Sequence, residues 1–361
     1  MTRGASVPQR TLTIDGFEIS DASNCYVVAE VGHNHQGDVE KCKELFRVAR
    51  ECGADAVKLQ KRDNRALYTR EMYDKPYDNE NSFGATYGEH REALEFGRDE
   101  YLELQRYCRE IGITFFATAF DLPSADFLES LDMPAYKIAS GDLRTTPLLR
   151  HVARFGKPMM VSTGGATMDD IMRAYDAITP INPQLCFLQC TAAYPASAED
   201  LNLNVITTLR ARFPELVIGL SDHENGIAMA VAAYVLGARV VEKHFTLNHT
   251  WKGTDHAFSL EPIGMRKLVR DLHRTRAALG SGIKCPLPAE QGPLTKMGKK
   301  LVARRALGVG HVLTEEDIAM KSPGDGLPPH LLGQVLGRTL TRPLQADDSI
   351  TFESLAQGEA E

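Results

Sequence analysis

The sequence lacks the features that mark three common classes of protein. Basic residues are not in surplus, because 41 lysines and arginines stand against 48 aspartates and glutamates, for a net charge of −7. Nucleic-acid-binding surfaces concentrate positive charge, so this balance argues against a nucleic-acid partner. No segment approaches the ~20 apolar residues of a membrane span, and the first residues lack the apolar core of a signal peptide.

Cysteine is present without a pattern. The seven cysteines are scattered along the chain, and no two of them form a CxxC pair. An odd number of cysteines without disulfide or zinc spacing indicates reduced thiols. Together with the missing signal peptide and membrane span, this predicts a cytoplasmic protein.

Strand-like and helix-like segments alternate eight times between residues 26 and 280. The predicted strands cover residues 26–32, 56–61, 114–120, 135–140, 158–163, 184–190, 216–222 and 240–246. A polar loop is expected over residues 62–97, between the second strand and its helix. Eight strands that are apolar on both faces, each followed by a helix, predict a (β/α)8 TIM barrel over residues 1–280. An open, doubly wound sheet is the alternative, but no GxGxxG follows the first strand.

Polar side chains gather at the ends of these strands, where TIM barrels carry their active sites. The strand-end residues are Glu30, Lys58, Gln60, Thr118, Lys137, Ser140, Ser162, Gln189, Thr191, Ser221, Asp222, His223, Glu242, Lys243 and His244. Lys58 and Lys137 lie between apolar neighbours, where a cation is costly without a counter-charge. A bound phosphate and carboxylate would supply that counter-charge.

Two histidines, His223 and His244, follow consecutive predicted strands. If those strands are adjacent, the two imidazoles lie close together at the same rim and suit a divalent metal with open positions. A pair of hydrogen-bonded histidines without metal is the alternative. His33 and His35, in the segment "GHNHQGD", are weaker candidates that could equally well only shape the pocket.

The character of the chain changes after Gly280. Residues 281–298 contain Pro286, Pro288 and Pro293 and are predicted to form a linker. Residues 299–361 have short apolar runs broken by glycine, proline and aspartate, which predicts a small, irregular, β-rich domain that needs a surface to pack against.

Motifs along the whole chain resemble those of the sialic acid synthase family. The matching segments are "AEVGHNHQGD", "AVKLQ", "YKIASGDL", "STGGA", "QCTAAYP", "GLSDH" and "EKHFT" in the barrel, and "GHVLTEEDI" and "PGDGLPPHLLGQVLGR" in an antifreeze-like (SAF) domain. The resemblance implies condensation of phosphoenolpyruvate with a six-carbon, N-acylated aldose such as N-acetylmannosamine, to give a nine-carbon 2-keto acid and phosphate. It also implies a domain-swapped homodimer, in which the SAF domain caps the active site of the opposite subunit.

The resemblance assigns roles to individual residues. It implies that His223 and His244 bind a divalent metal, most often manganese, with magnesium or cobalt as alternatives. Phosphoenolpyruvate would be held by Lys58, Thr118, Lys137, Ser140, Ser162 and Ser221. The sugar would be contacted by Gln60, Tyr194, Glu242 and Asp255. Glu30 would lie in the reacting centre, and either Glu30 or Glu242 could transfer the protons.

Two departures from the family pattern bear on the sugar. Ala192 stands where the family often has asparagine, and "KSPG" (residues 321–324) lacks the arginine that reaches the acyl group in the resembled enzymes. Other acceptors, such as a bacillosamine-derived sugar or an unacylated hexose, therefore stay open. Three rival functions are a phosphoenolpyruvate-dependent synthase of shorter sugar acids, a Schiff-base aldolase using Lys58, Lys137 or Lys243, and a non-enzymatic SAF-type binding protein.

Overall fold

The structure, a computed structural model, describes residues 10–356. The chain divides into two compact units, of which the first ends at Gly280 and the second begins at Ser281. Within the described residues, no helix combines the length and the apolar character needed to cross a membrane.

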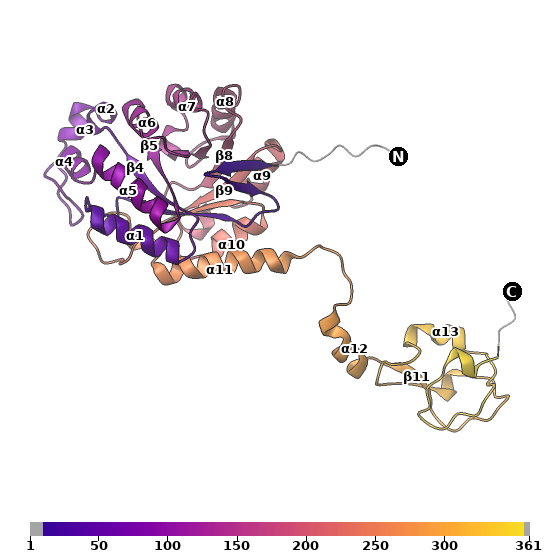
Figure 1. Cartoon of the computed structure of the whole chain (residues 1–361). Coiled ribbons are helices and arrows are strands. Elements are labelled where there is room, and N and C mark those ends of the chain that lie inside the picture. Colours follow the sequence, from indigo (N-terminus) through magenta and orange to yellow (C-terminus); the bar gives the residue numbers. More distant parts are fainter. Residues whose placement is uncertain (1–9, 357–361) are drawn as a thin grey trace. The chain divides into compact units, whose positions relative to one another are not determined.

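The first unit is a closed barrel of eight parallel strands (Figure 1). The strands are β3 (Tyr26–Gly32), β4 (Ala56–Lys61), β5 (Thr114–Ala119), β6 (Tyr136–Ile138), β7 (Met159–Ser162), β8 (Leu185–Cys190), β9 (Val217–Asp222) and β10 (Val240–His244). Each strand pairs with the next along the chain, and β10 closes the barrel on β3. Because a parallel strand is covered on both faces, every residue of β3 is buried. The predicted TIM barrel is confirmed.

Helices surround the strands (Figure 1). They are α1 (Val39–Glu51), α5 (Arg98–Ile111), α6 (Leu122–Glu129), α7 (Thr146–Ala153), α8 (Met168–Ile178), α9 (Val205–Arg212), α10 (Ala228–Val235) and α11 (Pro262–Leu279). In α1, the Asp38 side chain caps the first turn, and Cys42, Leu45, Phe46 and Ala49 form the buried stripe.

The prediction of a loop over residues 62–97 was wrong. This segment contains three short helices: α2 (Asn64–Leu67), α3 (Arg70–Asp74) and α4 (Tyr87–Glu92). Each is too short to show helical periodicity, but each has a capping side chain, from Asp63, Thr69 and Thr86. Local capping and packing thus determine helices that the apolar pattern does not reveal.

An N-terminal hairpin, β1 (Thr11–Ile14) and β2 (Phe17–Ser20), was not predicted. Its turn is Asp15-Gly16, and both residues have positive φ, as a two-residue hairpin turn requires. Leu12, Ile14 and Ile19 share a core cluster with residues at the amino ends of the barrel strands, including Tyr26, Ala56, Val217 and Val240. The hairpin therefore covers the end of the barrel opposite to the strand carboxyl ends.

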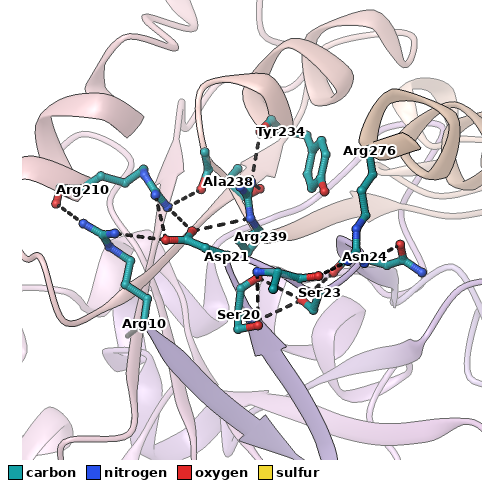
Figure 2. A network of polar contacts seen from close by, with 12 residues as sticks. Arg10, Ser20, Asp21, Ser23, Asn24, Arg210, Tyr234, Ala238, Arg239 and Arg276 are labelled. Carbon is teal, nitrogen blue, oxygen red and sulfur yellow. Dashed lines mark hydrogen bonds and ion pairs between the residues drawn. The ribbon is translucent and has the colours of Figure 1, made fainter. Parts of the chain in front are cut away.

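Asp21, just after β2, anchors the hairpin to the barrel (Figure 2). Its carboxylate accepts hydrogen bonds from Arg10 (3.1 Å) and Arg210 (2.8 Å), and Arg239 Nε lies 3.6 Å away. Burial alone would raise the pKa of Asp21, but the bonds and charges of these arginines outweigh it and lower the pKa. Arg276 of α11 binds the next turn through Asn24 Oδ1 at 3.0 Å.

The second unit is small and irregular. It contains α12 (Gln291–Met297), the antiparallel strands β11 (Lys300–Ala303) and β12 (Ile318–Lys321), and α13 (Leu332–Val335), around a core that includes Leu301, Ile318 and Ile350. The predicted linker is partly structured, because it holds a 3-10 turn (Pro288–Glu290) and α12. The carbonyl of Thr295 in α12 accepts a 2.7 Å bond from the Gly324 amide, so α12 is tied to this domain.

Candidate active site

A cavity of about 500 Å³ opens at the carboxyl ends of the barrel strands. The strand-end residues Gln189, Thr191, Asp222 and Lys243 do not line it, whereas all residues to which the resemblance assigns a role do: Glu30, Lys58, Gln60, Thr118, Lys137, Ser140, Ser162, Tyr194, Ser221, His223, Glu242, His244 and Asp255. Strand geometry explains the selection. Alternate side chains of a strand point to opposite faces, so Glu242 and His244 face the cavity. Lys243, between them, is absent from the cavity wall and pairs with Asp222 at 2.9 Å.

Two buried lysines and two buried glutamates form the centre of the cavity. Lys58 Nζ lies 2.5 Å from Glu30 Oε2 and donates to Thr118 Oγ1 at 2.7 Å. Glu242 Oε1 lies 3.4 Å from Lys137 Nζ and 3.6 Å from Lys58 Nζ. The sequence suggested that a bound anion would provide the counter-charge of the lysines. In the structure, the protein itself provides two carboxylates.

The two glutamates differ in acidity. Burial raises the pKa of Glu30, and the nearby charge of Lys58 does not cancel the effect. Burial also opposes ionisation of Glu242, but Lys137 and Lys58 hold the pKa of its carboxyl at about 2. Burial lowers the pKa of Lys137. Glu30 is therefore the carboxylate that takes up a proton more readily.

His223 and His244 lie side by side at the rim, with ring centroids 5.4 Å apart. His223 Nδ1 is 2.8 Å from the Thr191 carbonyl and can donate to it, which leaves the lone pair on Nε2. His244 Nδ1 is buried, has no hydrogen-bond partner within residues 10–356 and lies 3.7 Å from Asp255 Oδ2. Burial lowers the pKa of both imidazoles to about 4, so both are neutral at pH 7.

This donor set fits a divalent metal, because neutral imidazoles with free lone pairs are common metal ligands. The described residues contain no group of three or more histidine, cysteine, aspartate or glutamate side chains placed to hold a metal. The pair would thus supply two ligands and leave the other positions to water or substrate. Tyr194 and Phe258 pack against the rings, with centroids 4.1 Å from His223 and 4.9 Å from His244, and fix their orientation.

His33 and His35 are not part of the cavity wall. His35 stacks on Phe96 with centroids 4.1 Å apart, and its Nδ1 accepts a 3.0 Å bond from the Gly37 amide. His33 lies between Arg62 and Arg91, which do line the cavity. In the structure, these two histidines support the wall without forming it.

Family models match both units of the chain. The NeuB family model matches residues 45–284, more than half of the sequence, and the SAF domain model matches residues 300–356. The chain belongs to the NeuB family. The resemblance inferred from the motifs is thereby confirmed, and the β-rich second unit is an SAF domain.

Relatives of this NeuB family protein include proteins named as synthases of sialic-type acids. It is 43% identical over 330 residues to "N-acetylneuraminate-9-phosphate synthase" of Homo sapiens, covering 91% of this chain and 92% of the relative. It is 34% identical over 349 residues to "N,N'-diacetyllegionaminic acid synthase" of Legionella pneumophila, covering 95% and 98%. The crystal structure of a sialic acid synthetase from Leptospira borgpetersenii matches with a TM-score of 0.69 at 30% identity, covering 80% of this chain and 96% of that one. The protein is an enzyme of the sialic acid synthase family.

Several residues that line the cavity of this NeuB family protein were not predicted from its sequence. They include Arg62, Arg91, Phe120, Cys190 and Thr254. Arg62 directly follows β4 and could have been found by extending that strand end by one residue. Arg91 is carried by α4, so no strand-end rule points to it.

Proposed function

We propose that the protein condenses phosphoenolpyruvate with a six-carbon, N-acylated aldose to a nine-carbon 2-keto acid and releases phosphate. The observation that carries this proposal is the buried array of Lys58, Glu30, Lys137 and Glu242 beside the histidine pair, within one cavity. The names of the relatives, N-acetylneuraminate-9-phosphate and N,N'-diacetyllegionaminic acid synthases, support a nine-carbon product.

Phosphoenolpyruvate would bind at the lysines and the hydroxyl groups around them. Lys58 and Lys137 provide positive charge, and Thr118, Ser140, Ser162 and Ser221 provide hydroxyls along the same wall. Ser162 Oγ is buried and has no hydrogen-bond partner in the part of the chain that the structure describes, as expected for a group that binds a ligand. Holding the enol in a fixed position lowers the activation free energy, because the loss of translational and rotational entropy occurs on binding and not during the reaction.

The reaction forms one carbon–carbon bond and expels phosphate. Carbon three of the enol attacks the aldehyde carbon of the open-chain sugar, water adds to carbon two, and phosphate leaves from the tetrahedral adduct. A divalent cation held by His223 and His244, manganese in the first place with magnesium or cobalt as alternatives, would stabilise negative charge developing on the aldehyde oxygen. Glu30 suits proton transfer, because its pKa is raised and Gln60 Nε2 orients its Oε1 at 2.7 Å.

The sugar would lie on the side of Gln60, Tyr194, Glu242 and Asp255. Tyr194 is exposed over the histidine pair, and Asp255 reaches the same cavity from the segment after β10. Ala192 at the cavity wall leaves room where the family often has asparagine. N-acetylmannosamine is the first acceptor to test, beside bacillosamine-derived sugars and unacylated hexoses.

One assay tests this proposal. Purified protein is incubated with phosphoenolpyruvate and manganese and with each sugar of a panel, and the phosphate released is measured while the product is analysed by mass. We expect sugar-dependent phosphate release and a product three carbons longer than the acceptor. A seven- or eight-carbon product would indicate a synthase of shorter sugar acids, and no turnover with any sugar, free or phosphorylated, would favour the binding-protein alternative.

The same assay separates the Schiff-base aldolase. Borohydride added during turnover should trap no covalent adduct, because Lys58 and Lys137 are ion-paired with glutamates and Lys243 does not line the cavity. A trapped lysine adduct would move the protein to the aldolase class.

The SAF domain is proposed to cap the active site of the opposite subunit in a homodimer. Two observations support a covered surface: the core of the domain is small, and Val309, Val312 and Met320 are exposed. A test mixes two inactive variants, His244→Ala with an intact SAF domain and a chain that stops after Gly282. If the cap is exchanged between subunits, co-expression restores activity; no recovery in a verified mixed dimer would contradict the exchange.

A further inference from the structure

Two arginines of the cavity wall, Arg62 and Arg91, differ from the lysines because their guanidinium groups form no ion pair with a carboxylate among the described residues, although Glu95 and Asp255 lie near enough for their charges to act on them. Arg62 is buried, and its Nη2 donates to Gln60 Oε1 at 2.6 Å. Arg91 is partly buried and donates through Nε and Nη2 to the Tyr87 hydroxyl at 3.1 and 3.0 Å. The side-chain hydrogen-bond partners of both guanidinium groups are neutral, and such surroundings are costly for a buried cation such as Arg62, so a structural role alone explains it poorly.

His33 shows that these neutral partners cannot satisfy both guanidinium groups. Its Nε2 lies 3.2 Å from Arg62 Nη1, and its Nδ1 lies 3.3 Å from Arg91 Nη1. A neutral imidazole accepts at one ring nitrogen and donates at the other, and guanidinium groups only donate. His33 can therefore accept from one of the two arginines.

The nearby carboxylate of Glu95 indicates which of the two arginines cannot donate to His33. Glu95 Oε1 is buried, has no hydrogen-bond partner among the described residues and lies 3.6 Å from His33 Nε2. Oε2 of the same residue accepts from Lys61 Nζ at 3.0 Å and from the Arg62 backbone amide at 3.2 Å. A proton on His33 Nε2 would face the free oxygen of Glu95, and His33 Nδ1 would then accept from Arg91. Nη1 of Arg62 then has no acceptor among the residues described.

Aromatic rings hold both guanidinium groups in place. The Arg62 Cζ lies 3.7 Å from the centroid of Phe120, and the Arg91 Cζ lies 5.1 Å from the centroid of Tyr87. Stacking fixes the plane of a guanidinium while leaving its N–H edge available. Two such groups in one wall suit a phosphate, which guanidinium forks bind with directed, charge-assisted hydrogen bonds.

The pair lies beyond Gln60 as seen from the reacting centre. Gln60 donates to Glu30 Oε1 with its nitrogen and accepts from Arg62 with its oxygen, so the Gln60 side chain lies between Glu30 and Arg62. Resting on the proposed function, in which Gln60 contacts the sugar, we propose that Arg62 and Arg91 bind a phosphate group on the acceptor, at the end remote from its aldehyde. The protein would thus act on a sugar phosphate and discriminate against the neutral sugar.

The first experiment uses the unaltered enzyme. The kcat/KM for N-acetylmannosamine 6-phosphate is compared with that for N-acetylmannosamine, at saturating phosphoenolpyruvate. Losing one charge-assisted contact typically costs a factor of roughly 10 to 100 in affinity. With two arginines, the phosphorylated sugar should be preferred by about 100-fold or more. Equal use of both sugars, or preference for the neutral one, would overturn the proposal.

Variants then locate the preference. Arg62→Ala and Arg91→Ala should each reduce the ratio of the two kcat/KM values by roughly 10- to 100-fold, mainly by raising the KM for the sugar phosphate. Arg62→Lys should keep part of the preference, because it retains the charge. The matched control is Arg65→Ala, an exposed arginine that stacks on Tyr73 and does not line the cavity, and it should keep the full ratio. A higher KM for phosphoenolpyruvate with an unchanged ratio would assign the arginines to the other substrate and refute the proposal.

Calorimetric titration separates this proposal from the reaction itself. If neither sugar supports phosphate release but N-acetylmannosamine 6-phosphate still binds in an Arg62-dependent manner, the phosphate subsite stands and the proposed condensation fails. If the sugar phosphate binds the unaltered protein and Arg62→Ala equally well, or binds neither, the subsite is refuted.

Discussion

Removing the positive charge of Lys58 should cost the barrel stability as well as activity. The side chain is buried, and its loss leaves the Glu30 carboxylate with Gln60 as its remaining side-chain partner. Breaking one side of a buried ion pair typically costs about 3–5 kcal/mol. For Lys58→Met we therefore expect the free energy of unfolding to fall by about that amount. At roughly 2–4 °C per kcal/mol for a domain of this size class, the melting temperature should fall by about 10 °C.

A double-mutant cycle shows whether the cost comes from the orphaned carboxylate. Glu30→Gln in the Lys58→Met background removes the uncompensated charge, so the double variant should regain at least half of the lost stability. Both variants should stay inactive, because each lacks a residue proposed to contact the reactants. Urea unfolding followed by the fluorescence of Trp251, the one tryptophan of the chain, reports on the barrel and not on the SAF domain.

Lys243→Met is the matched control, because Lys243 is an equally buried lysine in an ion pair, with Asp222 at 2.9 Å, but outside the cavity. It should lose similar stability while the folded fraction keeps its activity. Two results would refute a tightly coupled buried pair. One is a loss of less than about 1 kcal/mol in the free energy of unfolding for Lys58→Met, and the other is a double variant whose loss equals the sum of the losses of the two single variants.

Four further predictions test other parts of the molecule. Chelation should abolish phosphate release, and manganese should restore it. His223→Ala and His244→Ala should stay folded but contain no bound metal, as measured by elemental analysis. Full activity without metal would contradict this prediction. Asp21→Asn should lower the free energy of unfolding by only about 1 kcal/mol, since the carboxylate is half exposed. Because the pKa of Asp21 is lowered, its contribution is complete above pH ~4 and is lost on acidification, so the variant should show a shallower acid dependence of unfolding in urea titrations. Asp317→Asn, which weakens bonds to its histidine, arginine and threonine partners, should cost the SAF domain about 1.5–3 kcal/mol and leave the barrel transition in a calorimetric scan unchanged. Binding of phosphoenolpyruvate should be accompanied by proton uptake, because an anion raises the already raised pKa of Glu30 further. Calorimetry in buffers of different ionisation enthalpy, repeated from acidic to neutral pH, should show this uptake, and Glu30→Gln should abolish it.

Much of the barrel and of its cavity wall could be predicted from the sequence. Parallel strands in a closed barrel leave a clear signature, since each is apolar on both faces and ends in polar residues at one common rim. Lys58 and Lys137 stand out because cations interrupt otherwise apolar strands, and the alternation of side chains then selects Glu242 and His244 over Lys243.

Other features depend on geometry that the chain does not display locally. The helices of residues 64–92 are too short for a periodic pattern, and Arg91 reaches the cavity only because α4 packs beside His33. The N-terminal hairpin was missed although Asp15-Gly16 between alternating apolar residues is a recognisable turn signal. The pairing of Lys58 with Glu30 follows from strand register, which sets the two residues opposite one another on β4 and β3.

The carboxylates beside the lysines compensate buried positive charge in the enzyme without substrate. A lysine buried alone tends to lose its proton, and a neutral amine has little attraction for an anion. Glu30 and Glu242 lie close enough to Lys58 and Lys137 to balance their positive charge before the substrate arrives. A phosphorylated enol that brings its own negative charge can then take over this role, and protonation of Glu30 would reduce the repulsion between the two. Arg62 needs no carboxylate to remain protonated, because a guanidinium keeps its proton in any protein environment. The two proposed sites therefore differ in charge arrangement. The enol site has lysines paired with carboxylates, whereas the sugar-phosphate site has arginines whose guanidinium groups form no such pair.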